Sequence, residues 1–142
     1  MDKDTKPVRV NALDITLFIV CVLFTVGMLT VFRPCSAKED GTWMTCHWAG
    51  NAVVGVAGAL TLMSLIHLAV ADPRRKQGID LAMIPAALLT AAIPGRLIGL
   101  CMMADMRCHR LTAPGATVFA IIVAAVAVID FLLRFRRRKN EV

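Results

Sequence analysis

Charged and aromatic residues are scarce in this chain of 142 residues. Only 18% of its residues are charged and 6% are aromatic, tyrosine is absent, and 58% are hydrophobic. A soluble domain of this length cannot bury so much apolar surface in a single core. The composition therefore excludes an ordinary soluble domain. It predicts a single integral membrane domain over residues 1–142, with the lipid bilayer as its solvent.

The sequence also lacks the signatures of soluble enzymes. It contains no glycine-rich phosphate loop, no His-Glu zinc helix and no nucleophile elbow. This favours a non-enzymatic role and leaves an enzymatic one open. The net charge of +6 does not indicate a nucleic-acid partner, because most basic residues stand in short segments between apolar runs, where topology alone requires them.

Four apolar runs are each long enough for one helical crossing of a bilayer. They predict an all-α fold, a polytopic membrane four-helix bundle built from two tandem helical hairpins. The predicted spans are about 13–32, 49–70, 79–100 and 116–133, with loops at 33–48 and 101–115.

One unit of sequence occurs twice. Each copy has an apolar run that ends in a cysteine, a short polar loop, a Met-x-Cys-His motif and a second apolar run. The motifs are Met44-Thr45-Cys46-His47 and Met106-Arg107-Cys108-His109. The separations Asp14–Cys35 and Asp80–Cys101 are both 21 residues, which is about the length of one bilayer crossing.

The distribution of lysine and arginine predicts the orientation. The amino-terminal tail has three, the turn between the second and third spans has three and the carboxyl tail has five, whereas the two cysteine-bearing loops together have four. By the positive-inside rule, both termini are expected to be cytoplasmic and both cysteine loops extracytoplasmic.

Four of the five cysteines are therefore expected on the oxidising side of the membrane, where disulfides persist. Three pairings of Cys35, Cys46, Cys101 and Cys108 are possible. The simplest ties each loop to itself, as Cys35–Cys46 and Cys101–Cys108, whereas crossed pairs would join the two hairpins. We favour structural disulfides, and we expect Cys21 to be a small buried hydrophobe.

Two other chemistries remain open for these loops. One is a soft-metal site, because thiolate, thioether and imidazole are the ligands that copper(I) prefers. Its candidate ligands are Met44, Cys46, His47, Met106, Cys108 and His109, with Met102 and Met103 nearby. Against it, a cysteine in a disulfide cannot bind a metal, and adjacent Cys and His rarely ligate one ion.

The other is thiol–disulfide exchange. Four spans with a cysteine pair in each outer loop resemble the DsbB-type membrane oxidoreductases, which pass electrons from a partner dithiol to quinone. That family's C-x-x-C pair is missing here. Arg96, an intramembrane charge five residues before Cys101, would favour a reactive thiolate there. A simpler interpretation is that Arg96 extends to the outer headgroups. We expect no cofactor, with quinone and copper as the alternatives.

The paired motifs carry a closer likeness. Met44 to Ala49 with the glycine-rich run that follows, Ile93-Pro94 through Cys101, and Met106-Arg107-Cys108 resemble the bacterial domain-of-unknown-function family 4418. The resemblance implies a small four-span protein of the bacterial inner membrane, often encoded beside MacB-like ABC transporters. It implies no activity and no catalytic residues. We therefore expect an accessory or scaffold subunit of a larger membrane complex, with a MacB-like transporter as partner and a homo-oligomer as an alternative.

Two further features bear on this role. The second span is rich in glycine and alanine, which serves either internal packing or docking of a partner. Asp14, Asp80, Asp130 and His67 all fall near the predicted cytoplasmic ends of their spans. A cluster of them would suit a proton relay. The favoured interpretation is that they reach water or nearby basic residues, with Asp130 and Arg134 paired four residues apart.

Overall fold

The computed structural model describes residues 10–33, 39–100 and 107–140. Its long helices are α1 (Ala12–Thr30), α2 (Thr45–Ala69), α3 (Pro73–Ala92) and α4 (Ala113–Asn140), and two wide five-residue turns are η1 (Ile93–Leu97) and η2 (Cys108–Thr112). Four helical segments are long and apolar enough to cross a membrane. The predicted all-α, multi-pass membrane architecture is therefore confirmed.

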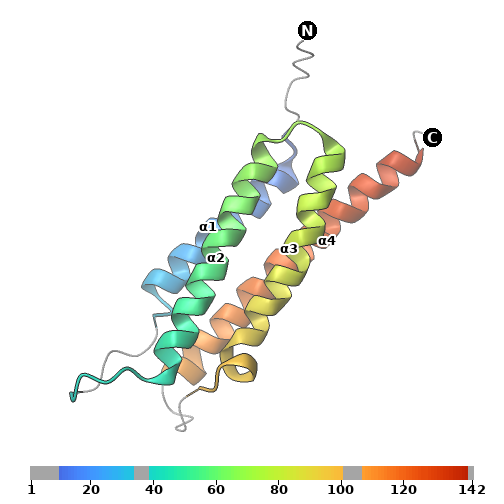
Figure 1. Cartoon of the computed structure of the whole chain (residues 1–142). Helices are drawn as coiled ribbons and strands as arrows, with labels where there is room; N and C mark the ends of the chain where they lie inside the picture. The colour runs from blue at the N-terminus through green and yellow to red at the C-terminus, as the bar shows by residue number, and fades with distance from the viewer. Residues whose placement is uncertain (1–9, 34–38, 101–106, 141–142) are drawn as a thin grey trace.

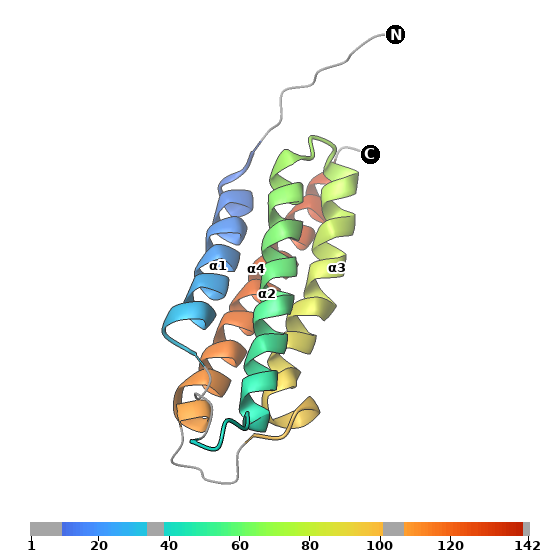
Figure 2. The same cartoon turned by 60° about the vertical axis from the view of Figure 1, so that its left-hand side comes forward.

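The four helices run alternately up and down, so that the start of α1 and the end of α4 lie at the same end of the bundle (Figures 1 and 2). The helix α1 packs against α2 and α4, and α3 packs against α4 and α2. Two tandem hairpins, α1–α2 and α3–α4, thus close into one bundle. We call the end where α1 begins and α4 ends the terminal end, and the opposite end, where α2 begins, the loop end.

The core follows a seam of residues spaced alternately three and four apart. On α1 the buried apolar residues are Leu17, Cys21, Phe24 and Met28. This spacing keeps one stripe of each helix facing its neighbours, as in other antiparallel bundles. A hydrogen bond between the Thr25 and Thr61 hydroxyls, at 2.9 Å, adds a polar link between α1 and α2.

Two helical segments begin earlier than the sequence predicted. The helix α2 starts at Thr45 rather than near residue 49, with Met44 as its N-cap residue. The helical path into α4 starts near Cys108 rather than near residue 116, through the wide turn η2. Pro114 provides a physical reason, since its ring clashes with the carbonyl four residues earlier and a wider turn relieves this contact. Cys46 and Cys108 are therefore helical rather than loop residues.

The third helix is also displaced toward the terminal end. It begins at Pro73 rather than near residue 79, because Asp72 caps it by accepting a 2.9 Å hydrogen bond from the Arg74 backbone N–H, and proline suits the first helical position. At its other end the helix stops before Pro94 and Gly95, where Gly95 has a φ of +88°. Pro85 lies within the helix without ending it.

Candidate functional site

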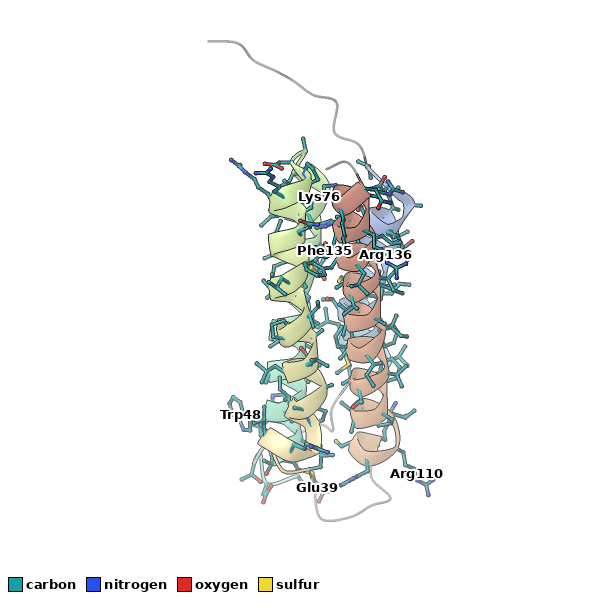
Figure 3. All side chains as sticks on the ribbon, turned by 90° about the vertical axis from the view of Figure 1, so that its right-hand side faces the viewer. Glu39, Trp48, Lys76, Arg110, Phe135 and Arg136 are labelled. Carbon is teal, nitrogen blue, oxygen red and sulfur yellow. The ribbon has the colours of Figure 1, made fainter. Side chains whose placement is uncertain are left out.

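A group of buried ionisable side chains occupies the core at the terminal end. We call these six residues the charge cluster, and every helix contributes to it: Asp14 from α1, His67 from α2, Lys76 and Asp80 from α3, and Asp130 and Arg134 from α4. All except Arg134 are essentially inaccessible, and the Arg134 side chain is 10% exposed. Figure 3 shows Lys76 between α3 and α4, near this end of the bundle.

The helical seam explains why these groups are buried. Asp14 stands three residues before Leu17, and Asp80 stands three residues before Met83, both in step with the buried stripe of their helices. Asp130 likewise follows Ala127 by three residues on α4. The positions that hold apolar side chains farther along each helix hold ionisable ones here, so the bundle geometry directs them inward.

Asp14 is held by cations from two other helices. The Lys76 ammonium donates to Asp14 Oδ2, and the Arg134 guanidinium donates to Asp14 Oδ1. The Asn11 backbone N–H also donates to Oδ2, at 3.2 Å, as part of a capping box at the start of α1. The Asp14 carboxylate is therefore well neutralised and well hydrogen-bonded.

Arg134 extends this network across the bundle. Its Nε donates to Asp130 Oδ2 at 3.0 Å, and its Nη2 lies 3.0 Å from the same oxygen. The distance from Arg134 Nε to Asp80 Oδ2 is 4.0 Å. One guanidinium thus lies among three carboxylates from three helices, a geometry that the planar five-donor group of arginine suits.

His67 is surrounded by the same carboxylates. Its Nε2 lies 3.0 Å from Asp80 Oδ1 and 3.4 Å from Asp130 Oδ2, and its Nδ1 lies 4.0 Å from Asp14 Oδ1. Neither ring nitrogen, and neither oxygen of Asp80, makes a well-aligned hydrogen bond within the described residues. These are the polar groups of the cluster whose hydrogen bonding is least satisfied.

The structure corrects the sequence interpretation of these charges. The expectation that Asp14, Asp80 and His67 reach water or nearby basic residues is wrong for water, because all three are fully buried. It is confirmed for Asp14 in its other part, since Lys76 and Arg134 both donate to this carboxylate. The alternative, that they form a cluster, is confirmed geometrically, as is the pairing of Asp130 with Arg134. Lys76 is one of the three basic residues that the sequence places in the turn between the second and third spans, yet it lies in α3 and is buried. The three- and four-residue spacing was the signal that could have found it.

The loop end brings the two sequence repeats together around one small pocket. Cys46 from α2 and Cys108 from η2 both line it, together with Pro94, Leu100 and Thr112 among others. Both cysteines are buried. The internal repeat therefore has a structural counterpart, since each copy supplies one aspartate (Asp14 or Asp80) to the charge cluster and one cysteine to this pocket.

Among the described residues, the other candidate metal ligands do not line that pocket. The His47 ring stacks on Trp43 with centroids 4.0 Å apart, and its Nε2 lies 3.0 Å from the Asn51 amide nitrogen. His109 is exposed, and Met44 precedes α2. Adjacent helical residues point about 100° apart, which separates each histidine from its neighbouring cysteine. Met102, Met103 and Met106 lie outside the described residues.

Of the remaining residues that the sequence singled out, two lie outside the described residues and two are placed by the structure. Cys35 and Cys101 lie outside the described residues, so the disulfide pairing stays a prediction. Cys21 is a buried free thiol in the core, as expected. Arg96 is exposed in η1, beyond the end of α3. The helix therefore does not continue from Arg96 to Cys101 as the sequence interpretation assumed, because Pro94 and Gly95 break it.

Comparison with protein families agrees with the likeness of the paired motifs. A family model described as "Domain of unknown function (DUF4418)" matches residues 17–133. The chain belongs to this family. The DUF4418 match includes His67, Lys76, Asp80 and Asp130, together with both Met-x-Cys-His motifs. No curated protein and no solved structure matches the chain.

Proposed function

We propose that the protein is a non-enzymatic accessory or scaffold subunit of a larger membrane complex. The sequence carries no enzyme signature, and the family likeness favours an ABC exporter of the MacB-like type as the partner. The observation that carries the proposal is the outward face of α2, which offers a surface of the kind that membrane helices use to associate.

A helix face that only contacts lipid does not require small residues, yet this face has several. Asn51, Gly55 and Ala59 are exposed and lie four residues apart, and Leu62, 63% exposed, continues the same face. A Cβ added at Gly55 would meet no described atom within 4 Å, so the glycine is not needed for packing within the bundle. Small residues at this spacing let a second helix approach closely.

The proposed topology places this face in the cell membrane with both termini cytoplasmic and the loop end outside. The distribution of lysine and arginine supports it, since the tails and the α2–α3 turn are the basic segments. In that orientation Cys46 and Cys108 lie on the oxidising side. Disulfides to Cys35 and Cys101 would then stabilise the two outer loops.

Site-specific photo-crosslinking in native membranes tests the docking face. A photoreactive residue at Leu62 is expected to give one discrete adduct with a transporter subunit, identified by mass spectrometry. The same residue at the exposed Ile122 of α4 serves as the control and is expected to give none. Adding Ala59→Leu to the Leu62 probe should abolish the adduct, whereas adding Ala125→Leu, at an exposed small residue of α4, should not.

Other crosslinking results would contradict the proposal. Equal adducts from α2 and α4 would indicate random encounter in the membrane, and no adduct from either would indicate a protein that acts alone. An adduct between two copies of this chain would replace the transporter with a homo-oligomer as the partner of α2.

A second candidate function, thiol–disulfide exchange, is favoured by one observation. Cys46 and Cys108 come from the two repeats, and both buried side chains line the same small pocket. In this function, two thiols of a partner would become one disulfide, and their two electrons and two protons would reduce a quinone to a quinol. Its test is the thiol state of the loop cysteines with and without added quinone. Disulfides that remain fully formed under both conditions would contradict it.

A further inference from the structure

The charge cluster is short of one positive charge. Asp14, Asp80 and Asp130 bring three carboxylates, and Lys76 and Arg134 bring two permanent cations. These residues, with His67, are the charged or titratable groups that α1, α2, α3 and α4 direct into the cluster within the described residues. A buried unpaired charge is strongly unfavourable in a membrane interior. One additional positive charge is therefore needed.

The surroundings of His67 indicate where that charge is held. Both ring nitrogens face carboxylate oxygens, Nε2 toward Asp80 and Asp130 and Nδ1 toward Asp14. A neutral imidazole has a proton on only one nitrogen, so it would direct a lone pair at a carboxylate on its other side. The imidazolium has an N–H on both sides, so that each ring nitrogen directs a positive N–H rather than a lone pair toward carboxylate oxygens.

Asp80 supports the same assignment. Its carboxylate oxygens make no well-aligned hydrogen bond within the described residues, and the Arg134 Nε atom is 4.0 Å away. The His67 ring, at 3.0 Å, is therefore its closest polar partner. An ionised Asp80 beside a neutral His67 would be a buried anion with no adequate partner, which is costly.

We propose that the charge cluster is a binding site for one proton, held by the His67–Asp80 pair inside the membrane-spanning bundle. The proton makes the cluster electrically neutral. Arg134 is the cluster member whose side chain is partly exposed to water, at the terminal end. The proton therefore exchanges with water at that end. The site does not depend on the proposed accessory role.

The net charge of the cluster also favours a proton over a metal ion as the bound cation. Asp14, His67 and Asp130 could place one ligand atom each within 4.8 Å of the others. A divalent ion there would leave the cluster with one excess positive charge. It would also have to compete with Lys76 and Arg134 for Asp14, to which both are hydrogen-bonded. The proton satisfies the same carboxylates and displaces neither cation.

Nuclear magnetic resonance of the histidine ring tests the proposal directly. The chain has three histidines, so the double variant His47→Gln/His109→Gln leaves His67 as the only one. The ¹⁵N-histidine-labelled protein in lipid nanodiscs is examined at pH 7. We expect both ring nitrogens of His67 to be protonated. Infrared spectra with ¹³C-labelled aspartate then report whether a carboxyl group carries the proton instead. Loss of the protonated-carboxyl band in Asp80→Asn would assign it to Asp80, which would equally support a proton held by the pair.

Two variants test whether the number of carboxylates in the cluster determines the protonation of His67. Asp80→Asn removes one carboxylate and balances the cluster without the proton, so His67 is expected to become neutral at pH 7. Asp72→Asn is the matched control, because Asp72 caps α3 outside the cluster and asparagine is also a good N-cap residue. His67 should stay protonated in that variant.

Three outcomes would overturn the proposal. The first is a neutral His67 beside an ionised Asp80 in the otherwise native chain, a measurement that does not require Asp80→Asn to fold. The second is a His67 that stays doubly protonated in Asp80→Asn. The third is one equivalent of a bound metal, found by elemental analysis of the same nanodisc sample.

Discussion

The His67 imidazole lies 3.0 Å from an Asp80 carboxylate oxygen, and both side chains are fully buried. His67 belongs to the α1–α2 hairpin and Asp80 to the α3–α4 hairpin. The contact therefore joins the two halves of the bundle, as does the hydrogen bond from Lys76 to Asp14. The two sequence repeats meet through charge at the terminal end and through the cysteine-lined pocket at the loop end.

Replacing His67 by glutamine should strongly destabilise the bundle, because it leaves three buried carboxylates facing two cations. The expected loss is about 3–5 kcal/mol, the usual cost of an uncompensated buried charge. His67→Gln/Asp80→Asn restores the balance and should recover most of this stability. Thermal unfolding in detergent measures both variants, with His47→Gln at the loop end as the control. A double variant no more stable than His67→Gln alone would show that charge balance is not the cause.

Two adjacent basic residues should differ sharply on replacement by methionine. Lys76 is buried against Asp14, whereas the Arg75 side chain is 79% exposed beside Asp72. Lys76→Met should therefore cost about 3–5 kcal/mol. Arg75→Met should change the stability by at most about 0.5 kcal/mol, because exposed pairs contribute little. Unfolding midpoints of the two purified variants provide the measurement, and similar midpoints would contradict the burial of Lys76.

Replacing each of two glycines by alanine should change the stability of the bundle differently. A Cβ at Gly115 would lie 2.6 Å from ring atoms of Phe32, whereas a Cβ at Gly55 would meet no described atom within 4 Å. The Phe32 ring is itself in an edge contact with Phe119, which limits its movement. Gly115→Ala should therefore destabilise the bundle by about 1–3 kcal/mol through overpacking. Gly55→Ala should be neutral or slightly stabilising. Equal shifts in unfolding midpoint would contradict the Phe32 contact.

The loop disulfides are testable by acid quenching, alkylation and mass spectrometry of native membranes. We expect Cys35–Cys46 and Cys101–Cys108, both fully formed. Cys46→Ser or Cys108→Ser should lower the abundance of the protein, because a disulfide contributes about 2–4 kcal/mol. Cys21→Ala is the control, since this buried thiol is free and its removal leaves the loop bonds intact. A partly reduced pool would favour thiol exchange, and a Cys46–Cys108 bond would replace the intra-loop pairing.

The number and type of the helices were predictable because apolar runs of one bilayer length admit few other structures. The ends of the helices were not. Capping by Asp72 extended α3 toward the terminal end, and the wide turn before Pro114 extended the helical path of α4 to Cys108. Such ends depend on a few local contacts, which hydropathy does not register.

The candidate site, too, was predictable from the sequence only in part. The sequence alone determined that Asp14, His67, Asp80 and Asp130 stand near one end of four spans, and that Cys46 and Cys108 occupy equivalent places in two repeats. Only the tertiary structure decided that the ionisable groups face one another rather than water. The position of a residue along its helix sets how far its side chain lies from the end of the bundle. The rotation of each helix about its own axis, which is set by the packing of the four helices, decides whether the side chain points inward.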